Sequence, residues 1–103
     1  ASLFRNKSMV ALDLRQEEGR RIVRDLVREC QIVVENFKPG AMESWGLGYD
    51  ALAAENPALV MVRISGFGQT GPYRERPGYG VIGEAVSGLR YINGDPGHPP
   101  ARM

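Results

Sequence analysis

Short apolar runs alternate along the chain with stretches in which apolar residues repeat at helical spacing, and this alternation constrains the fold more than any other feature. From Gln16 to Cys30 the apolar residues recur at i, i+1, i+4, i+5 and i+8, which is one stripe of an amphipathic α-helix. The run Gln31–Phe37 follows with a continuous apolar centre, a pattern typical of a strand buried on both faces of a parallel sheet. Helices placed between such runs favour parallel βαβ units.

The same criteria predict elements on either side of this helix and strand. Further strands are expected at Met9–Leu14 and Ala58–Ile64. The remaining segments are, in chain order, about one helical turn at Ala41–Trp45, a helix from Tyr49 that ends at Asn56-Pro57, a long Gly- and Pro-rich loop at Gly66–Gly80, a helix over Val81–Leu89 with the same stripe as the first, and a turn-rich tail at 93–103. Three strands and about three helices are few for a complete α/β domain, so residues 1–103 are predicted to be a single partial domain with a parallel βαβ sheet, the central part of a larger one.

Composition excludes several classes of function. Thirteen basic residues against twelve acidic ones leave a formal net charge of +1, which provides no field that would attract nucleic acid or an anionic membrane. A single cysteine excludes an internal disulfide and multi-cysteine zinc sites, and a single histidine excludes a His–His metal pair, so no metal site is predicted. No apolar run approaches the roughly 20 residues that span a bilayer, and no signal peptide opens the chain, so a cytoplasmic location is expected.

A glycine motif, Gly66–Gly71, matches G-x-G-x-x-G and follows a predicted strand, as a dinucleotide-binding turn does. In such a turn the next helix begins at once and its N-terminus faces the pyrophosphate. Here Pro72 follows and no helix is predicted before about Tyr79. Three interpretations stay open: a nicotinamide- or flavin-binding turn, a flexible glycine loop, or a mobile lid over an active site.

Polar residues also follow two of the predicted strands. Asn36, Phe37 and Lys38 come after one strand, and the segment Leu12–Arg15 ends the preceding one. Because ligands of open α/β sheets bind at the carboxyl edge of the strands, both segments are candidates for a ligand crevice. For Asn36–Lys38 the alternative is a simple strand-end turn before a helix that begins at a proline. For Leu12–Arg15 the alternative is a buried strand end in which Asp13 caps the next helix and Arg15 is solvated.

Other polar residues suggest no catalytic constellation. The arginines of the first helix are interleaved with acidic residues and have no aromatic neighbours, unlike the arginines of a nucleic-acid-binding surface. The acidic residues outside that helix are too scattered to indicate an acid/base pair: Glu35, Asp50, Glu84 and Asp95.

Several short motifs occur in an order that resembles one known family. The motifs are, in chain order, Asn6-Lys7-Ser8, Ala11–Leu14, Val34–Gly40, Gly46–Tyr49, Asn56-Pro57, Ser65–Pro72, Arg76–Tyr79 and Ser87–Leu89. Together they resemble the family III coenzyme A transferases, the CaiB/BaiF family, which includes formyl-CoA and carnitine-type CoA-transferases and α-methylacyl-CoA racemases. The resemblance covers nearly the whole chain, and the combination of motifs is far more specific than any one of them.

The resemblance implies a segment of the large, Rossmann-like domain of an enzyme that moves CoA from an acyl-CoA thioester to a carboxylic acid. The family's route runs through an intermediate formed on an aspartate, which is nucleophilic catalysis by a carboxylate. The implied partners are therefore acyl-CoA and a small carboxylic acid, with coenzyme A as substrate and no permanently bound cofactor. The full-length parent is expected to be a homodimer of interlocked subunits.

The resemblance also implies which residues contact CoA. They form three clusters, at two strand ends and after the glycine-rich loop: Leu12, Asp13, Leu14 and Arg15; Asn36, Phe37 and Lys38; and Arg76, Pro77, Gly78 and Tyr79. The first two clusters match stretches that line the CoA site, and the third matches the stretch that approaches the CoA phosphates.

Departures from the family pattern limit what residues 1–103 are expected to do. The family's acceptor aspartate lies a few residues beyond a Pro-Pro stretch like Pro99-Pro100 and is expected beyond Met103, so no catalytic residue is assigned and the chain alone is predicted to be inactive. Racemases carry a catalytic histidine at the position of Tyr79, which disfavours a racemase. A non-catalytic binding or assembly module of the same fold and, less favoured, an NAD-binding fragment remain as alternatives.

Overall fold

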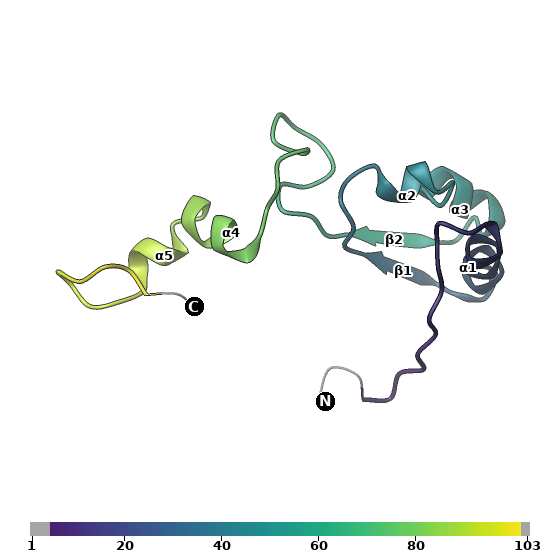
Figure 1. Ribbon diagram of the computed structural model, residues 1–103, viewed down its shortest axis with the longest axis horizontal. Coiled ribbons are helices and arrows are strands. Elements are labelled where there is room, and N and C mark those ends of the chain that lie inside the picture. The colour runs from purple at the N-terminus through teal and green to yellow at the C-terminus, as the bar shows by residue number, and fades with distance from the viewer. Residues whose placement is uncertain (1–4, 102–103) are drawn as a thin grey trace.

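Two parallel strands with helices along one side form the main body of the structure, a computed structural model that describes residues 5–101 (Figure 1). The elements are, in chain order, α1 (Glu17–Glu29), β1 (Ile32–Glu35), α2 (Ala41–Ser44), α3 (Tyr49–Glu55), β2 (Val60–Arg63), α4 (Gly80–Val86) and α5 (Leu89–Ile92). This arrangement of helices around a parallel sheet confirms the predicted α/β class.

The sheet is a parallel pair with α2 and α3 in the crossover between its strands. Ile32 lies opposite Val60 at the start of the pair, and Glu35 lies opposite Arg63 at its end. Both strands therefore finish at the same edge, as the sequence predicted for consecutive βαβ strands. The chain leaves this edge through Asn36 after β1 and Ile64 after β2.

The helix α1 is fixed to the end of α3 by polar contacts as well as by packing. The side-chain amide nitrogen of Asn56 donates hydrogen bonds to the carbonyl oxygens of Val27 (3.0 Å) and Cys30 (2.8 Å), which satisfies acceptors at the C-terminus of α1. The guanidinium of Arg28 contacts the Glu55 carboxylate at 2.7 Å. Residue Asn56 was expected only to end a helix, and its side chain also joins two helices.

A small apolar core lies between the helices and one face of the sheet. Its buried members come from α1, α2, α3 and the connecting segments: Val27, Met42, Leu47, Leu52 and Leu59. Val33 and Met61, which are paired across the two strands, pack against this cluster from the sheet. The alternate residues of the strands point to the opposite face.

That opposite face is exposed, so the prediction of a strand buried on both faces is wrong for the described chain. Ile32 and Val34 are 57% and 63% exposed, and their partners Val60 and Val62 are also exposed. The reason is that the helices of residues 5–101 cover only the face that carries Val33. The apolar run correctly indicated a strand, but its second face has no covering layer among these residues.

The predicted strand at Met9–Leu14 is also wrong. Residues 7–13 run without regular secondary structure, and the side chain of Met9 is exposed. A strand needs a neighbour to satisfy its backbone groups, and no strand of residues 5–101 lies beside this segment.

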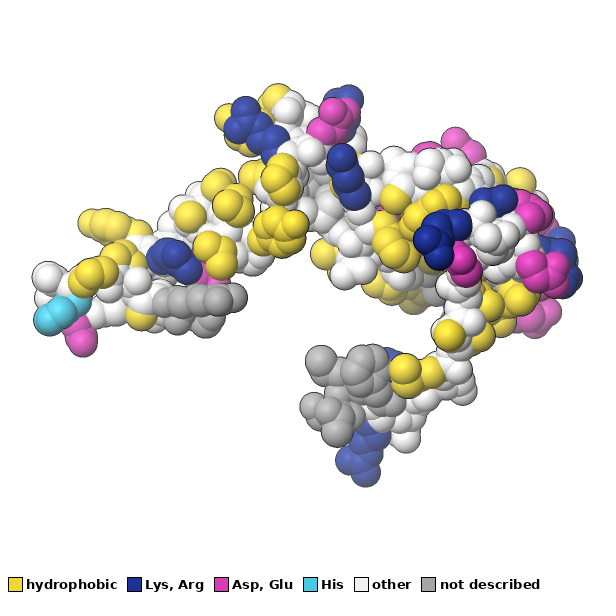
Figure 2. Space-filling model, in the orientation of Figure 1, with side chains coloured by type: hydrophobic (Ala, Val, Ile, Leu, Met, Phe, Trp, Pro, Cys, Tyr) yellow, Lys and Arg dark blue, Asp and Glu magenta, His cyan; other side chains and the backbone are white. Residues whose placement is uncertain are grey.

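Beyond the loop that follows β2, α4 and α5 extend away from the body as an arm (Figure 1). The predicted single helix over Val81–Leu89 is interrupted, because Gly88 adopts a left-handed φ of 80° between α4 and α5. Neither helix buries a residue, and apolar side chains are visible along the arm (Figure 2). The radius of gyration is 17.9 Å, against about 13 Å for a compact chain of this length. None of the helices in the described part of the chain is long and apolar enough to cross a bilayer.

Candidate functional site

A cavity of about 790 Å³ opens at the carboxyl edge of the sheet, between the turn after β1 and the loop before α4. Its lining residues come from three segments: Asn36, Phe37, Lys38 and Pro39; Ile64, Ser65 and Gly66; and Arg74, Glu75, Arg76, Pro77, Gly78, Tyr79 and Gly80. The volume falls in the range of small-molecule sites, and this edge is where parallel sheets bind ligands.

The wall of this cavity is held by a close backbone crossing between Gly66 and Gly78. A Cβ atom on Gly66 would collide with the Cα of Gly78, and a Cβ on Gly78 would collide with the Cα of Gly66. Only glycine fits at both positions, so the loop between them is closed at its base (Figure 1). We call this crossing the glycine neck.

The closed loop has its own aromatic packing, which orients one of the cationic side chains of the cavity. The rings of Phe67 and Tyr73 meet edge to face with centroids 5.7 Å apart. The guanidinium carbon of Arg76 lies 4.1 Å from the centroid of the Tyr73 ring. A cation over an aromatic face is attracted by the ring quadrupole, so Tyr73 holds Arg76 without neutralising its charge.

Two of the cations at the cavity differ from those of α1, although a third, Arg74, pairs with Glu75 at 3.3 Å. Along α1 the arginines are paired with carboxylates, as for Arg24 with Glu17 at 2.8 Å. Lys38 and Arg76 make no ion pair with any carboxylate of residues 5–101. Two unneutralised cations at one cavity favour an anionic ligand.

An aromatic side chain lies beside these cations. Phe37 is partly exposed and lines the cavity, and its ring meets Trp45 edge to face with centroids 5.1 Å apart. Trp45 in turn packs against the apolar core. The core thus supports Phe37 from behind and leaves part of its ring available to a ligand.

A buried ionic network lies directly behind this turn, and sequence reasoning missed it. Glu35 is 5% exposed and accepts a hydrogen bond from Nε of Arg63 at 2.7 Å. Arg63 also donates to both carboxylate oxygens of Glu43, at 2.6 and 3.0 Å. These bonds raise the pKa of the Arg63 guanidinium and lower the pKa of the Glu43 carboxyl. The signal in the sequence was a single charge at the end of each apolar strand, Glu35 and Arg63, which the scattered-acid interpretation passed over.

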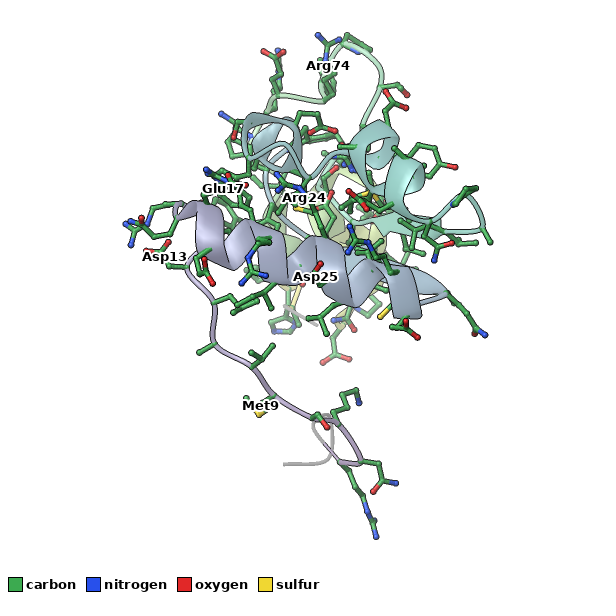
Figure 3. The ribbon with its side chains drawn as sticks, turned by 90° about the vertical axis from the view of Figure 1, so that its right-hand side faces the viewer. Met9, Asp13, Glu17, Arg24, Asp25 and Arg74 are labelled. Atoms are coloured by element: carbon green, nitrogen blue, oxygen red, sulfur yellow. The ribbon has the colours of Figure 1, made fainter. Side chains whose placement is uncertain are left out.

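Two of the three predicted clusters meet at the cavity, and the third does not. Asn36–Lys38 and Arg76–Tyr79 line it together, whereas Leu12–Arg15 contributes no lining residue. Asp13 lies next to the start of α1, well apart from Arg74 on the loop (Figure 3). The contact of Leu12–Arg15 with CoA therefore stays a prediction.

The segment Leu12–Arg15 has a local structure of its own. The Asp13 carboxylate binds the Arg15 guanidinium at 2.9 Å and accepts from its backbone N–H at 3.0 Å, and these bonds lower the pKa of Asp13. Asp13 makes no side-chain cap on α1, so the interpretation as a helix-capping residue is wrong. Its backbone instead lies against Gly19, where a Cβ atom would collide with the Asp13 carbonyl oxygen.

The glycine motif Gly66–Gly71 does not form a dinucleotide-binding turn. No helix starts at Gly71, and α4 begins only at Gly80. The geometry that would present a helix N-terminus to a pyrophosphate is absent from this loop. Gly68 and Gly71 adopt left-handed φ values of 80° and 89°, which fits the interpretation as a shaped glycine loop.

Comparisons with known proteins agree along the whole chain. A family model described as "CoA-transferase family III" matches residues 1–103. The chain is 54% identical over 98% of its length to a succinyl-CoA–D-citramalate CoA-transferase of Chloroflexus aurantiacus, and 39% identical over 99% to a human succinyl-CoA:glutarate CoA-transferase. A solved structure of a CAIB/BAIF family protein from Brucella suis superposes with a TM-score of 0.87 at 44% identity, covering 91% of this chain and 25% of that one. The chain spans 25% and 24% of the lengths of the two named transferases.

Proposed function

Residues 1–103 belong to CoA-transferase family III, and we propose that they form part of an enzyme that moves CoA from an acyl-CoA thioester to a carboxylic acid. The observation that carries the proposal is the cavity at the carboxyl edge of the sheet, where Lys38 and Arg76 have no carboxylate partner and Phe37 offers an aromatic surface. The relatives described above are named for succinyl-CoA as donor, and we extend that class of donor to this protein.

In this proposal the cavity binds the CoA portion of the thioester. CoA carries a diphosphate and a further phosphate, and cations without carboxylate partners retain their full charge for these groups. Lys38 and Arg76 are therefore assigned to the phosphates. Phe37 is assigned to a flat ring of the ligand, and the amide of Asn36 to its polar groups.

No residue of this segment is assigned as nucleophile. The family resemblance leads us to expect the acceptor aspartate outside this segment, so the role proposed for residues 1–103 is to bind and orient the CoA thioester. Dimerisation of the full-length protein and the contact of Leu12–Arg15 with CoA belong to the same proposal.

Calorimetric titration of CoA into the full-length protein tests the assignment. Replacing Asn36 and Phe37 by Ala is expected to weaken CoA binding about 10- to 100-fold, because both a polar and an aromatic contact are lost. Unchanged affinity would contradict the site.

The charge assignment has a matched control. Arg76→Ala is expected to weaken CoA binding about tenfold and to reduce its dependence on ionic strength. Arg21→Ala removes the same charge from the outer face of α1, where Arg21 pairs with Glu18 at 2.6 Å, and is expected to leave binding unchanged. Equal losses in both variants would indicate a general charge effect and not a phosphate contact.

A further inference from the structure

The carboxylate of Glu35 is buried at the end of β1, directly before the residues that line the cavity. It belongs to the one charged residue within residues 5–101 that is buried, with 5% of its surface exposed. Burying a carboxylate is costly unless partners replace its water, and Glu35 has two. One oxygen accepts the Nε–H of Arg63 at 2.7 Å, and the other accepts the backbone N–H of Phe37, also at 2.7 Å.

The second of these bonds fixes the backbone that carries the cavity residues. Phe37 is two residues after Glu35, so the bond turns the chain sharply at the end of the strand and leaves Asn36 at the corner. Charge-assisted bonds of this kind are shorter and stronger than neutral ones. The main chain at Phe37 is thereby tied to the buried end of β1.

Arg63 holds the Glu35 carboxylate in the orientation that this turn requires. It lies opposite Glu35 in the parallel register, and its two terminal nitrogens bind the Glu43 carboxylate of α2. One planar guanidinium therefore connects the ends of both strands to the helix that follows the turn. Glu35 itself does not line the cavity, so any effect on a ligand must pass through Phe37.

We propose that Glu35 is a positioning residue for CoA binding, which it supports by fixing the backbone of Phe37 while Arg63 fixes Glu35. This inference rests on the proposed function, because it concerns the same cavity. Glu43 binds the outer side of Arg63 through a partly exposed carboxylate, whereas the Phe37 N–H is bound by Glu35.

The test is CoA titration and steady-state kinetics of the full-length protein carrying Glu35→Gln. Phe37 and Arg63 donate to different oxygens of Glu35. Glutamine keeps the size of the side chain, but its NH2 group replaces one of these oxygens and would face one of the two donors, so both bonds cannot persist in this geometry. The expected result is an approximately tenfold weaker affinity for CoA and a matching rise in KM for acyl-CoA, with kcat changed less than twofold. Glu43→Gln is the matched control and is expected to change the affinity less than twofold, because the bond from the Phe37 N–H to the Glu35 carboxylate remains.

The outcomes separate the inference from the proposed function. Wild-type affinity in Glu35→Gln, together with lost affinity in Phe37→Ala, would overturn the inference alone. Equal losses in Glu35→Gln and Glu43→Gln would also overturn it, because the effect would then be one of scaffold stability. No CoA binding by the wild-type protein would overturn the proposed function and the inference with it. If Glu35→Gln does not fold, Glu35→Asp is the second variant. It keeps the charge but shortens the side chain by one methylene, which moves the carboxylate away from Phe37 and Arg63. Wild-type affinity in that variant would overturn the inference.

Discussion

The helix α1 and the arm of α4 and α5 carry the same apolar spacing, yet only α1 is packed. In both, apolar residues fall at i, i+1, i+4, i+5 and i+8. In α1 this stripe meets the core and buries Val27, whereas in the arm no residue is buried and Ile92 is 75% exposed. An amphipathic stripe specifies which face of a helix can pack, and a partner surface must still be present.

The partner surface of α1 is made by elements close to it in the chain. The helix α3 supplies Leu52, the segment between α3 and β2 supplies Leu59, and β1 supplies Val33. Asn56 and Glu55 add polar contacts at the C-terminal end of α1. The arm follows the glycine neck, and its two helices contact each other without burying a residue. Stability in residues 5–101 is therefore expected to be concentrated in the body.

The sharpest test of this difference is a pair of truncations, Leu52→Ala in α3 and Ile92→Ala in α5. Leu52 is fully buried, so its truncation should lower the free energy of unfolding of the 103-residue chain by about 2–5 kcal/mol. Ile92→Ala should change it by less than about 0.5 kcal/mol. Urea unfolding followed by circular dichroism measures both. Similar losses would show that the arm is packed as tightly as the body.

A second test addresses the glycine neck that joins the two regions. In Gly78→Ala the new methyl group collides with the backbone of Gly66, and overpacking of this kind costs about 1–3 kcal/mol. Gly80→Ala is the control, because its Cβ would meet no atom within 4 Å and its φ is not left-handed. We expect Gly78→Ala to weaken CoA binding in the full-length protein more than Gly80→Ala does, because both residues line the cavity but only the methyl group at Gly78 displaces the backbone of Gly66. Equal behaviour of the two variants would contradict a closed neck.

A third test compares one glycine from each region, both of them within a helix. Gly83→Ala in α4 is expected to stabilise the arm by about 0.5–1 kcal/mol, because alanine favours helix and its Cβ meets nothing within 4 Å. Gly19→Ala in α1 gains the same propensity but collides with the Asp13 carbonyl oxygen. Amide hydrogen exchange should show slower exchange in α4 for the first variant and faster exchange around residues 13–16 for the second. Slower exchange at both sites would contradict the close approach of Asp13 to α1.

Local patterns predicted much of the fold, because they depend on neighbours in the chain. The stripe in Gln16–Cys30, the Pro-Gly break before α2 and the Asn56-Pro57 stop all correspond to observed element boundaries. The wrong predictions concern segments that need a neighbouring strand or layer which residues 5–101 do not supply. Within residues 5–101, Met9–Leu14 has no strand beside it, and Ile32 and Val34 have no layer above them. Apolar spacing cannot say whether the surface that a segment needs is present.

The candidate site was predictable in part for the same reason. Asn36–Lys38 were predicted at the carboxyl edge because they follow a strand, and Arg76–Tyr79 were predicted from the family resemblance. Both segments line the same cavity. The Glu35–Arg63 pair was missed because its partners are 28 residues apart and meet only through the parallel register. The glycine neck was missed because a crossing of two backbones has no side-chain signature.

The smallest expected effect concerns the Glu43 carboxylate, and it tests whether the ionic network contributes to the stability of the body. Hydrogen bonds from Arg63 lower the pKa of Glu43 below its ordinary value of 4.5 in the folded state. The unfolded chain therefore binds more protons between these two pKa values, so the contribution of Glu43 is present above pH 4.5 and is lost as the pH falls through the folded value. Because the side chain is about half exposed, this contribution should stay below about 1 kcal/mol. Urea unfolding of the 103-residue chain and of Glu43→Gln should show a constant difference near neutral pH that shrinks below pH 4.5. The other carboxylates titrate in both proteins and cancel in the difference, so a pH-independent gap would mean that packing of Glu43, and not its charge, stabilises the body.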